Sequence, residues 1–362
     1  MIKIILNPVL KIFIILTAII FISSCSNPAA DTTLSLMDEL RALDLDKYID
    51  SVGYDTIDEL TAPTWKLYKY DTSVCKCVLG SEFRIGVKEK STTNNIVFLM
   101  DGGGACWPGK YSCATDALLP SGWDDSSGNP LNGWSVVHVP YCDGSVHMGD
   151  NDAYYNSANY YHRGLKLTTA GIAIMKSLNP NPPKIFITGC SAGGYGTFMA
   201  YLLIRRFFPD SALYIFNDSG PGLWNPDNGM KEKIIDAWKF TSYLPKSCTS
   251  CDTQIMNLYD WILQRDTNVR IGLFSSYYDH TIGGSFLDFA SPYSEYKDLL
   301  VSTSDIIKSK YPARFKRFFI NDDTHCVSEA PGNYLYAVQG TSLVTWLSQL
   351  INDDSSWSDL LE

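Results

Sequence analysis

The sequence has few charged residues and no cluster of basic ones. Only 19% of its 362 residues are charged, and 29 Lys and Arg stand against 39 Asp and Glu, for a formal net charge of -10. A phosphate backbone would be repelled, which excludes nucleic acid as a partner. Beyond the N-terminal region the sequence also lacks a hydrophobic run of transmembrane length, an internal repeat and a long linker. With 45% apolar residues, it predicts one large folded domain.

Metal-binding motifs are missing as well. There is no H-E-x-x-H, and Cys248-x-x-Cys251 has neither a second C-x-x-C nor a paired histidine motif. A local disulfide or a small capping loop is expected at this pair, and no metal or cofactor is predicted. Ten cysteines are many for a reduced cytosol, so they indicate an oxidising compartment.

The N-terminus has the pattern of an export signal. Residues 12–22 form an apolar run after a positively charged start, too short for a membrane span but typical of a signal-peptide core. Ile-Ser-Ser before Cys25 resembles a bacterial lipobox, although an ordinary cleaved signal followed by a chance cysteine is the alternative. We expect a signal peptide over 1–24, a lipidated Cys25, a tether and N-terminal segment over 25–60, and a catalytic domain over 61–362. The protein is then a membrane-anchored lipoprotein of the bacterial cell envelope.

Apolar runs bounded by turn residues alternate with segments of helical periodicity. The runs predict strands at Phe83–Val87, Ile96–Met100, Val136–Val139, Ile185–Thr188, Leu213–Asn217, Ile271–Ser275 and Arg317–Ile320. The periodic segments predict helices at Gly164–Leu178, Ala192–Phe207, Lys231–Tyr243, Gln254–Arg265, Ser302–Lys310 and Thr341–Leu350. This alternation predicts an α/β-hydrolase fold, with a mostly parallel central sheet flanked by helices and functional residues at the carboxyl ends of strands.

A G-x-S-x-G pattern follows the predicted strand Ile185–Thr188. Gly189 and Gly193 flank Ser191, and a predicted helix begins at Ala192. In this strand-turn-helix context the pattern predicts a nucleophile elbow, although a plain glycine-rich turn is the alternative. The helix N-terminus would offer free N–H groups to an oxyanion.

A second glycine cluster, Asp101-Gly-Gly-Gly104, follows the strand Ile96–Met100. At this position the fold supplies the remaining oxyanion N–H, so Gly103 or Gly104 would act together with Ala192. A phosphate-binding loop is excluded because no G-K-[ST] follows and Asp101 would repel phosphate. A purely structural tight turn is the other interpretation.

The order serine, acid, histidine then selects Asp279 and His325, which follow the last two predicted strands. His325 would act as the general base for Ser191, and Asp279 would fix its tautomer. His280 is the rival base, and Asp218, after the preceding strand, is the rival acid.

Several motifs together resemble one family. They are Leu99–Trp107, Val139–Ser145, Ile187–Gly196, Tyr277–Ile282 and Asp323–Cys326. Their residues and order are similar to those of the pectin acetylesterase and Notum family of carboxylesterases, over roughly residues 75 to 350. The resemblance implies that Ser191, Asp279 and His325 are the catalytic residues. The sequence departs from the family in having Asp101 before the glycines, where Glu is usual, and Ala105 after them in place of an aromatic residue.

The resemblance also implies a disulfide framework. With Cys25 lipidated, nine thiols remain, so four bridges at most can form. Pairing by analogy gives Cys106 with Cys113, Cys77 or Cys75 with Cys142, and Cys248 with Cys251 as a local candidate, with Cys190 and Cys326 left as a further option.

The sequence thus predicts a serine carboxylesterase that removes O-acyl groups, most simply acetyl, from a polysaccharide such as pectin through an acyl-serine. The alternatives are a longer-chain or protein O-deacylase, a serine peptidase, and a carbohydrate-binding protein that retains the hydrolase fold. The expected partners are an acylated carbohydrate or other ester substrate, and the membrane through Cys25.

Overall fold

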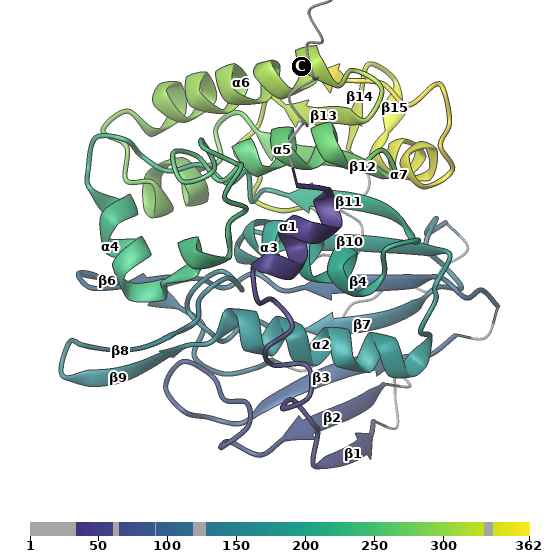
Figure 1. Cartoon of the computed structure of the whole chain (residues 1–362). Helices are drawn as coiled ribbons and strands as arrows, with labels where there is room; N and C mark the ends of the chain where they lie inside the picture. The colour runs from purple at the N-terminus through teal and green to yellow at the C-terminus, as the bar shows by residue number, and fades with distance from the viewer. Residues whose placement is uncertain (1–33, 61–64, 91, 119–127, 329–335) are drawn as a thin grey trace, which may run out of the picture. The chain divides into compact units, whose positions relative to one another are not determined.

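A mixed central sheet organises the protein in the computed structural model (Figure 1). The structure describes residues 34–60, 65–90, 92–118, 128–328 and 336–362. Ser35–Glu362 forms one compact unit. The predicted signal peptide, Cys25 and the first part of the tether lie outside the described residues.

Ten strands of the described residues form this sheet. In spatial order they are β1 (Thr56–Glu59), β2 (Lys66–Tyr70), β3 (Phe83–Lys88), β7 (Ser135–Val139), β4 (Ile96–Met100), β10 (Lys184–Cys190), β11 (Ala212–Asp218), β12 (Val269–Ser276), β13 (Phe315–Ile320) and β16 (Leu360–Leu361). From β7 to β16 all neighbours are parallel, whereas β1, β2, β3 and β7 pair antiparallel.

Helices cover both faces of the sheet. They are α1 (Leu36–Ala42), α2 (Gly164–Leu178), α3 (Ala192–Phe207), α4 (Met230–Trp238), α5 (Asn257–Arg265), α6 (Pro292–Lys310) and α7 (Leu343–Ile351), with a 3-10 helix η1 (Phe240–Tyr243) and a π-helix η2 (Thr281–Phe286). Figure 1 shows α2 and α3 lying across one face of the parallel strands.

Strand side chains alternate between two cores, as the two-residue period requires. Ile185 and Ile187 of β10 belong to the core beneath α2 and α3. Phe186 between them belongs to the core on the other face, where Trp346 of α7 packs. Both faces are therefore apolar, which is why these strands read as near-continuous apolar runs in the sequence.

Three two-stranded hairpins lie outside the main sheet. They are β5 (Gly104–Trp107) with β6 (Lys110–Cys113), β8 (Asn151–Tyr155) with β9 (Ala158–His162), and β14 (Ala337–Val338) with β15 (Thr341–Ser342). The first begins inside the glycine cluster, so that cluster leads from β4 directly into a hairpin.

Two predicted helices have the wrong extent. The helix predicted at Ser302–Lys310 begins ten residues earlier, at Pro292. The segment Lys231–Tyr243 is not continuous, because α4 ends at Trp238 and Lys239 adopts a left-handed conformation with φ 56°. The apolar periodicity continues across this break because η1 buries Phe240 and Tyr243. Within the described ranges, each helix is too short or too polar to cross a membrane.

Candidate active site

Ser191 occupies the sharp turn between β10 and α3. Its φ of 55° and ψ of -115° lie in a region that non-glycine residues rarely adopt. Its N–H donates to the carbonyl of Asp218 at 2.8 Å, and only 8% of the residue is exposed. This is the geometry of a nucleophile elbow, which presents a serine at the end of a strand.

The start of α3 packs against the end of β4. A Cβ at Gly193 would lie 2.1 Å from the carbonyl oxygen of Met100, so only glycine permits this approach. Because Met100 directly precedes the glycine cluster, the contact holds that cluster beside Ser191.

The predicted oxyanion residues surround the same pocket. Gly104 has φ +76°, and a Cβ there would lie 1.9 Å from the carbonyl oxygen of Ser112. Gly104 and Ala192 line the pocket together with Ser191, while Gly103 precedes them and accepts a hydrogen bond from the N–H of Ala114 at 2.7 Å. The oxyanion role stays a prediction, and it is the positions of Gly104 and Ala192 that support it.

Asp101 is held from two sides at the start of this loop. His138 Nε2 donates to its carboxylate at 2.7 Å, and His147 Nε2 donates to its carbonyl at 3.0 Å. Both histidines are buried. His138, which lies in β7, therefore has a structural role, and Asp101 is fixed by the fold at the position where the family usually has Glu.

His325 and Asp279 form a hydrogen-bonded pair at the carboxyl ends of β13 and β12. The distance between His325 Nδ1 and Asp279 Oδ2 is 2.8 Å. The other carboxylate oxygen, Asp279 Oδ1, accepts from the N–H of Ile282 at 3.0 Å. Asp279 is buried, at 1% exposure. A carboxylate partner at Nδ1 makes that nitrogen the donor, which leaves Nε2 for proton transfer.

A disulfide ties this pair to the elbow. Cys190, directly before Ser191, is bonded to Cys326, directly after His325. A ring nitrogen of His325 lies within 4.8 Å of both sulfur atoms. Since the sulfurs are bonded to each other, they offer no thiolate to a metal ion. The bridge instead brings the candidate base to the side of the candidate nucleophile.

The rival base is placed elsewhere. His280 is exposed at the start of η2, and its ring contacts Tyr293 with 6.2 Å between centroids. His162 is buried, and it bonds Tyr155 and the carbonyl of Asp143 at 3.0 and 3.1 Å. Burial lowers the pKa of His162 to about 4. It is thus neutral near pH 7, and its hydrogen bonds give it a structural role.

Asp218, the rival acid, anchors the histidine loop. Its fully buried Oδ2 accepts from the N–H groups of Val327 and Ser328 at 2.9 and 2.8 Å and from the Ser328 hydroxyl at 2.5 Å. Burial raises the pKa of Asp218, and these hydrogen bonds act against that shift. Sequence reasoning considered Asp218 only as a catalytic acid and missed this role, because no local motif joins residues 110 positions apart.

Three further disulfides are present among the described residues. They pair Cys77 with Cys142, Cys106 with Cys113, and Cys248 with Cys251. Of the two candidate partners for Cys142, it is Cys77 that forms the bridge. Cys75 is a buried free thiol. The Cys106–Cys113 bridge joins β5 to β6 and so braces the hairpin that begins at Gly104.

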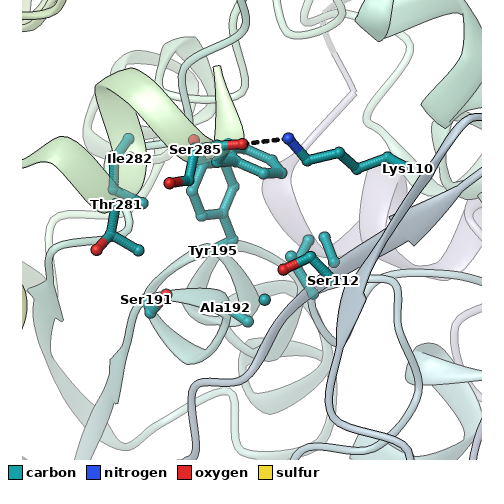
Figure 2. A pocket seen from close by; sticks show the side chains of 12 residues that line it. Lys110, Ser112, Ser191, Ala192, Tyr195, Thr281, Ile282 and Ser285 are labelled. Carbon is teal, nitrogen blue, oxygen red and sulfur yellow. Dashed lines mark hydrogen bonds between the residues drawn. The ribbon is translucent and has the colours of Figure 1, made fainter. Parts of the chain in front are cut away.

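The pocket at Ser191 has an empty volume of about 450 Å³ and is shown in Figure 2. Its lining is largely apolar, through Ala105, Val146, Tyr195, Ile282 and Phe286. Lys110, Ser112, Thr281 and Ser285 add polar groups. Such a mixed lining is typical of a site for a small organic group.

The sheet, the strained serine turn and the neighbouring Asp-His pair define the class of an α/β-hydrolase. The pectinacetylesterase family model matches residues 122–299. The solved structure of the Wnt deacylase Notum from Drosophila is similar, with a TM-score of 0.59, 15% sequence identity, and coverage of 85% of this chain and 96% of that chain. The curated proteins give no significant match.

The family model supports the pectin acetylesterase family for this chain and confirms the resemblance seen in its motifs. The likeness to the Notum structure confirms the predicted α/β-hydrolase fold. The family match supports an esterase or deacylase of the carboxylesterase type. The matched segment contains Ser191 and Asp279, whereas Gly104 and His325 lie on either side of it.

Proposed function

We propose that the protein is a serine carboxylesterase that removes O-acyl groups, most simply acetyl, from a polysaccharide such as pectin. The observation that carries the proposal is the 2.8 Å hydrogen bond between Asp279 and His325, held beside Ser191 by the Cys190–Cys326 bridge. This is the arrangement that activates a serine hydroxyl, because the acid orients the imidazole and stabilises its charged form.

In the proposed reaction, Ser191 Oγ attacks the ester carbonyl and its proton passes to His325 Nε2. The N–H groups of Gly104 and Ala192, with Gly103 as the further candidate, stabilise the oxyanion. Collapse of the tetrahedral intermediate breaks the bond to the sugar oxygen, which takes the proton from His325 and leaves as a hydroxyl. Water, deprotonated by His325, then attacks the acyl-serine. As the carboxylic acid is released, His325 returns the proton to Ser191 Oγ. The sequence of steps requires no metal or cofactor.

The proposed location rests on the N-terminal sequence. We place the protein outside the cytoplasm, anchored to a membrane of the bacterial envelope by a lipid on Cys25 after cleavage of residues 1–24. The lipobox-like sequence before Cys25 supports this. The four disulfides suit an oxidising compartment.

The test is the release of acetate from a panel of acetylated polysaccharides, including pectin and xylan. The wild-type protein should release acetate from at least one of them, and a folded Ser191→Ala variant should release none. His280→Ala serves as the matched control and should keep its activity. Peptide cleavage without ester cleavage would instead favour the serine peptidase, and an active Ser191→Ala variant would refute the serine mechanism.

A further inference from the structure

Two walls of the Ser191 pocket are joined by a single side chain. Lys110, the first residue of β6, donates from Nζ to the carbonyl oxygen of Ser285 in η2 at 2.5 Å. Both residues line the pocket. In Figure 2 this bridge crosses the pocket on the side away from Ser191 and Ala192.

Both ends of the bridge are held in position by parts of the candidate active site. The β5–β6 hairpin, which carries Lys110, is closed by the Cys106–Cys113 disulfide. The π-helix η2 begins two residues after Asp279, whose carboxylate accepts from the N–H of Ile282. π-Helices are rare overall, and those that occur are often found at functional sites. The lysine therefore spans the pocket between two segments that are each attached to the candidate active site.

A second cavity adjoins the Ser191 pocket at Lys110. It has an empty volume of about 440 Å³ and shares Lys110 and Phe286 with the Ser191 pocket. Trp107 and Met230 give it apolar walls, and Asn228, Lys233 and Asp288 line its polar side. The Trp107 ring contacts that of Phe286 with 5.8 Å between centroids. Lys110 and Phe286 thus form a partition between two adjoining spaces.

The chemistry of this partition favours short acyl groups. An acetyl group on Ser191 needs only the space in front of the partition. A longer alkyl chain would press against the ammonium of Lys110, displacing its hydrogen bond to Ser285 and removing water from the charge. The bond is exposed in the free protein, and a chain seated against it would bury the ammonium without a partner. Burying an unpartnered charge is unfavourable, so chain length is penalised where the pocket ends.

We propose that Lys110 is a specificity-determining residue that restricts the Ser191 pocket to short acyl groups. The inference rests on the proposed esterase function. Lys110 sets the upper limit of acyl-chain length. Without its side chain, a longer acyl chain would enter the second cavity.

The test is the ratio of kcat/KM for para-nitrophenyl octanoate to that for para-nitrophenyl acetate. Each methylene group newly buried is worth about fourfold in binding, so room for two of them should raise the ratio in Lys110→Ala by about 10-fold or more. Lys110→Met keeps the length of the side chain but neither the charge nor the hydrogen bond, and it should raise the ratio as well. Lys110→Arg keeps the charge and should leave it near the wild-type value.

Lys233→Ala is the matched control. Lys233 lines the second cavity, so its loss removes the same charge nearby without opening the partition, and the ratio should not change. An unchanged ratio in both Lys110→Ala and Lys110→Met, with the variants folded and active, would overturn the proposal. Failure of the esterase function itself would look different, since the wild-type protein would then cleave neither ester in a Ser191-dependent way.

Discussion

The Cys190–Cys326 disulfide should be the strongest covalent support of the catalytic domain. The perturbation is the paired substitution Cys190→Ala and Cys326→Ala, with Cys106→Ala and Cys113→Ala as the comparison. Both pairs lie beside the candidate active site, and each paired variant loses one bridge and two sulfur atoms. They differ mainly in the length of chain that the bridge closes.

The expected magnitudes follow from those lengths. The bridged residues are 136 positions apart in the first pair and 7 apart in the second. Restricting the unfolded chain by such loops corresponds to about 5 kcal/mol and about 2.4 kcal/mol, respectively. The free energy of unfolding should therefore fall by about 2.5 kcal/mol more in the Cys190/Cys326 variant than in the Cys106/Cys113 variant.

The assay is urea-induced unfolding followed by circular dichroism, with kcat measured on an acetyl ester at a denaturant concentration where each variant is still folded. The Cys190/Cys326 variant should also lose kcat, because its bridge fixes the separation of Ser191 from His325. Equal stability losses in the two variants would refute the loop-length argument. An unchanged kcat in the folded variant would show that the bridge does not position the base.

Further substitutions test the individual residues. Ser191→Ala and His325→Ala should each lower kcat at least about a thousandfold, and the double variant should be scarcely worse, because the two act as one unit; additive losses in kcat would contradict this. Asp279→Asn should lower kcat by about 10⁴-fold through the wrong imidazole tautomer, and a wild-type kcat would exclude Asp279 as the acid. Asp218→Asn should lower the free energy of unfolding by about 2 kcal/mol, measured by urea unfolding. It should lower kcat less than Asp279→Asn does, measured by steady-state kinetics. A larger loss of kcat in Asp218→Asn than in Asp279→Asn would make Asp218 the acid. Cys25→Ser should abolish labelling by a fatty-acid analogue, and persistent labelling would end the lipoprotein hypothesis.

Much of the fold could be predicted because the central strands are buried on both faces. β4 is predicted residue for residue, and helices α2 and α3 match their predicted bounds. The edge strand β1 was missed because all four of its residues are exposed, so no apolar pattern marks it. The β8–β9 hairpin was missed for a similar reason, since most of its residues are exposed or only partly buried and no continuous apolar run marks its strands.

The catalytic residues of the candidate site could be predicted because their order along the chain, and their positions directly after strands, are visible in the sequence. Ser191, Asp279 and His325 each follow a strand, and parallel strands bring those ends together. Contacts across the fold leave no such signal. Lys110 and Ser285 are 175 positions apart, and neither lies in a recognisable motif. Only the three-dimensional arrangement of the hairpin and η2 brings them together.

The two sides of the site differ in how firmly they are held. Asp218 links the nucleophile to the base, since its carbonyl accepts from the N–H of Ser191 and its carboxylate accepts from the loop after His325. The Cys190–Cys326 bridge makes the same connection covalently. Moving the base away from the nucleophile would therefore require breaking a covalent bond and several buried hydrogen bonds. The far side of the pocket is joined by the Lys110 bridge, whose lysine is only half-buried. Substitutions there can change which acyl group fits without disturbing the residues that cleave it.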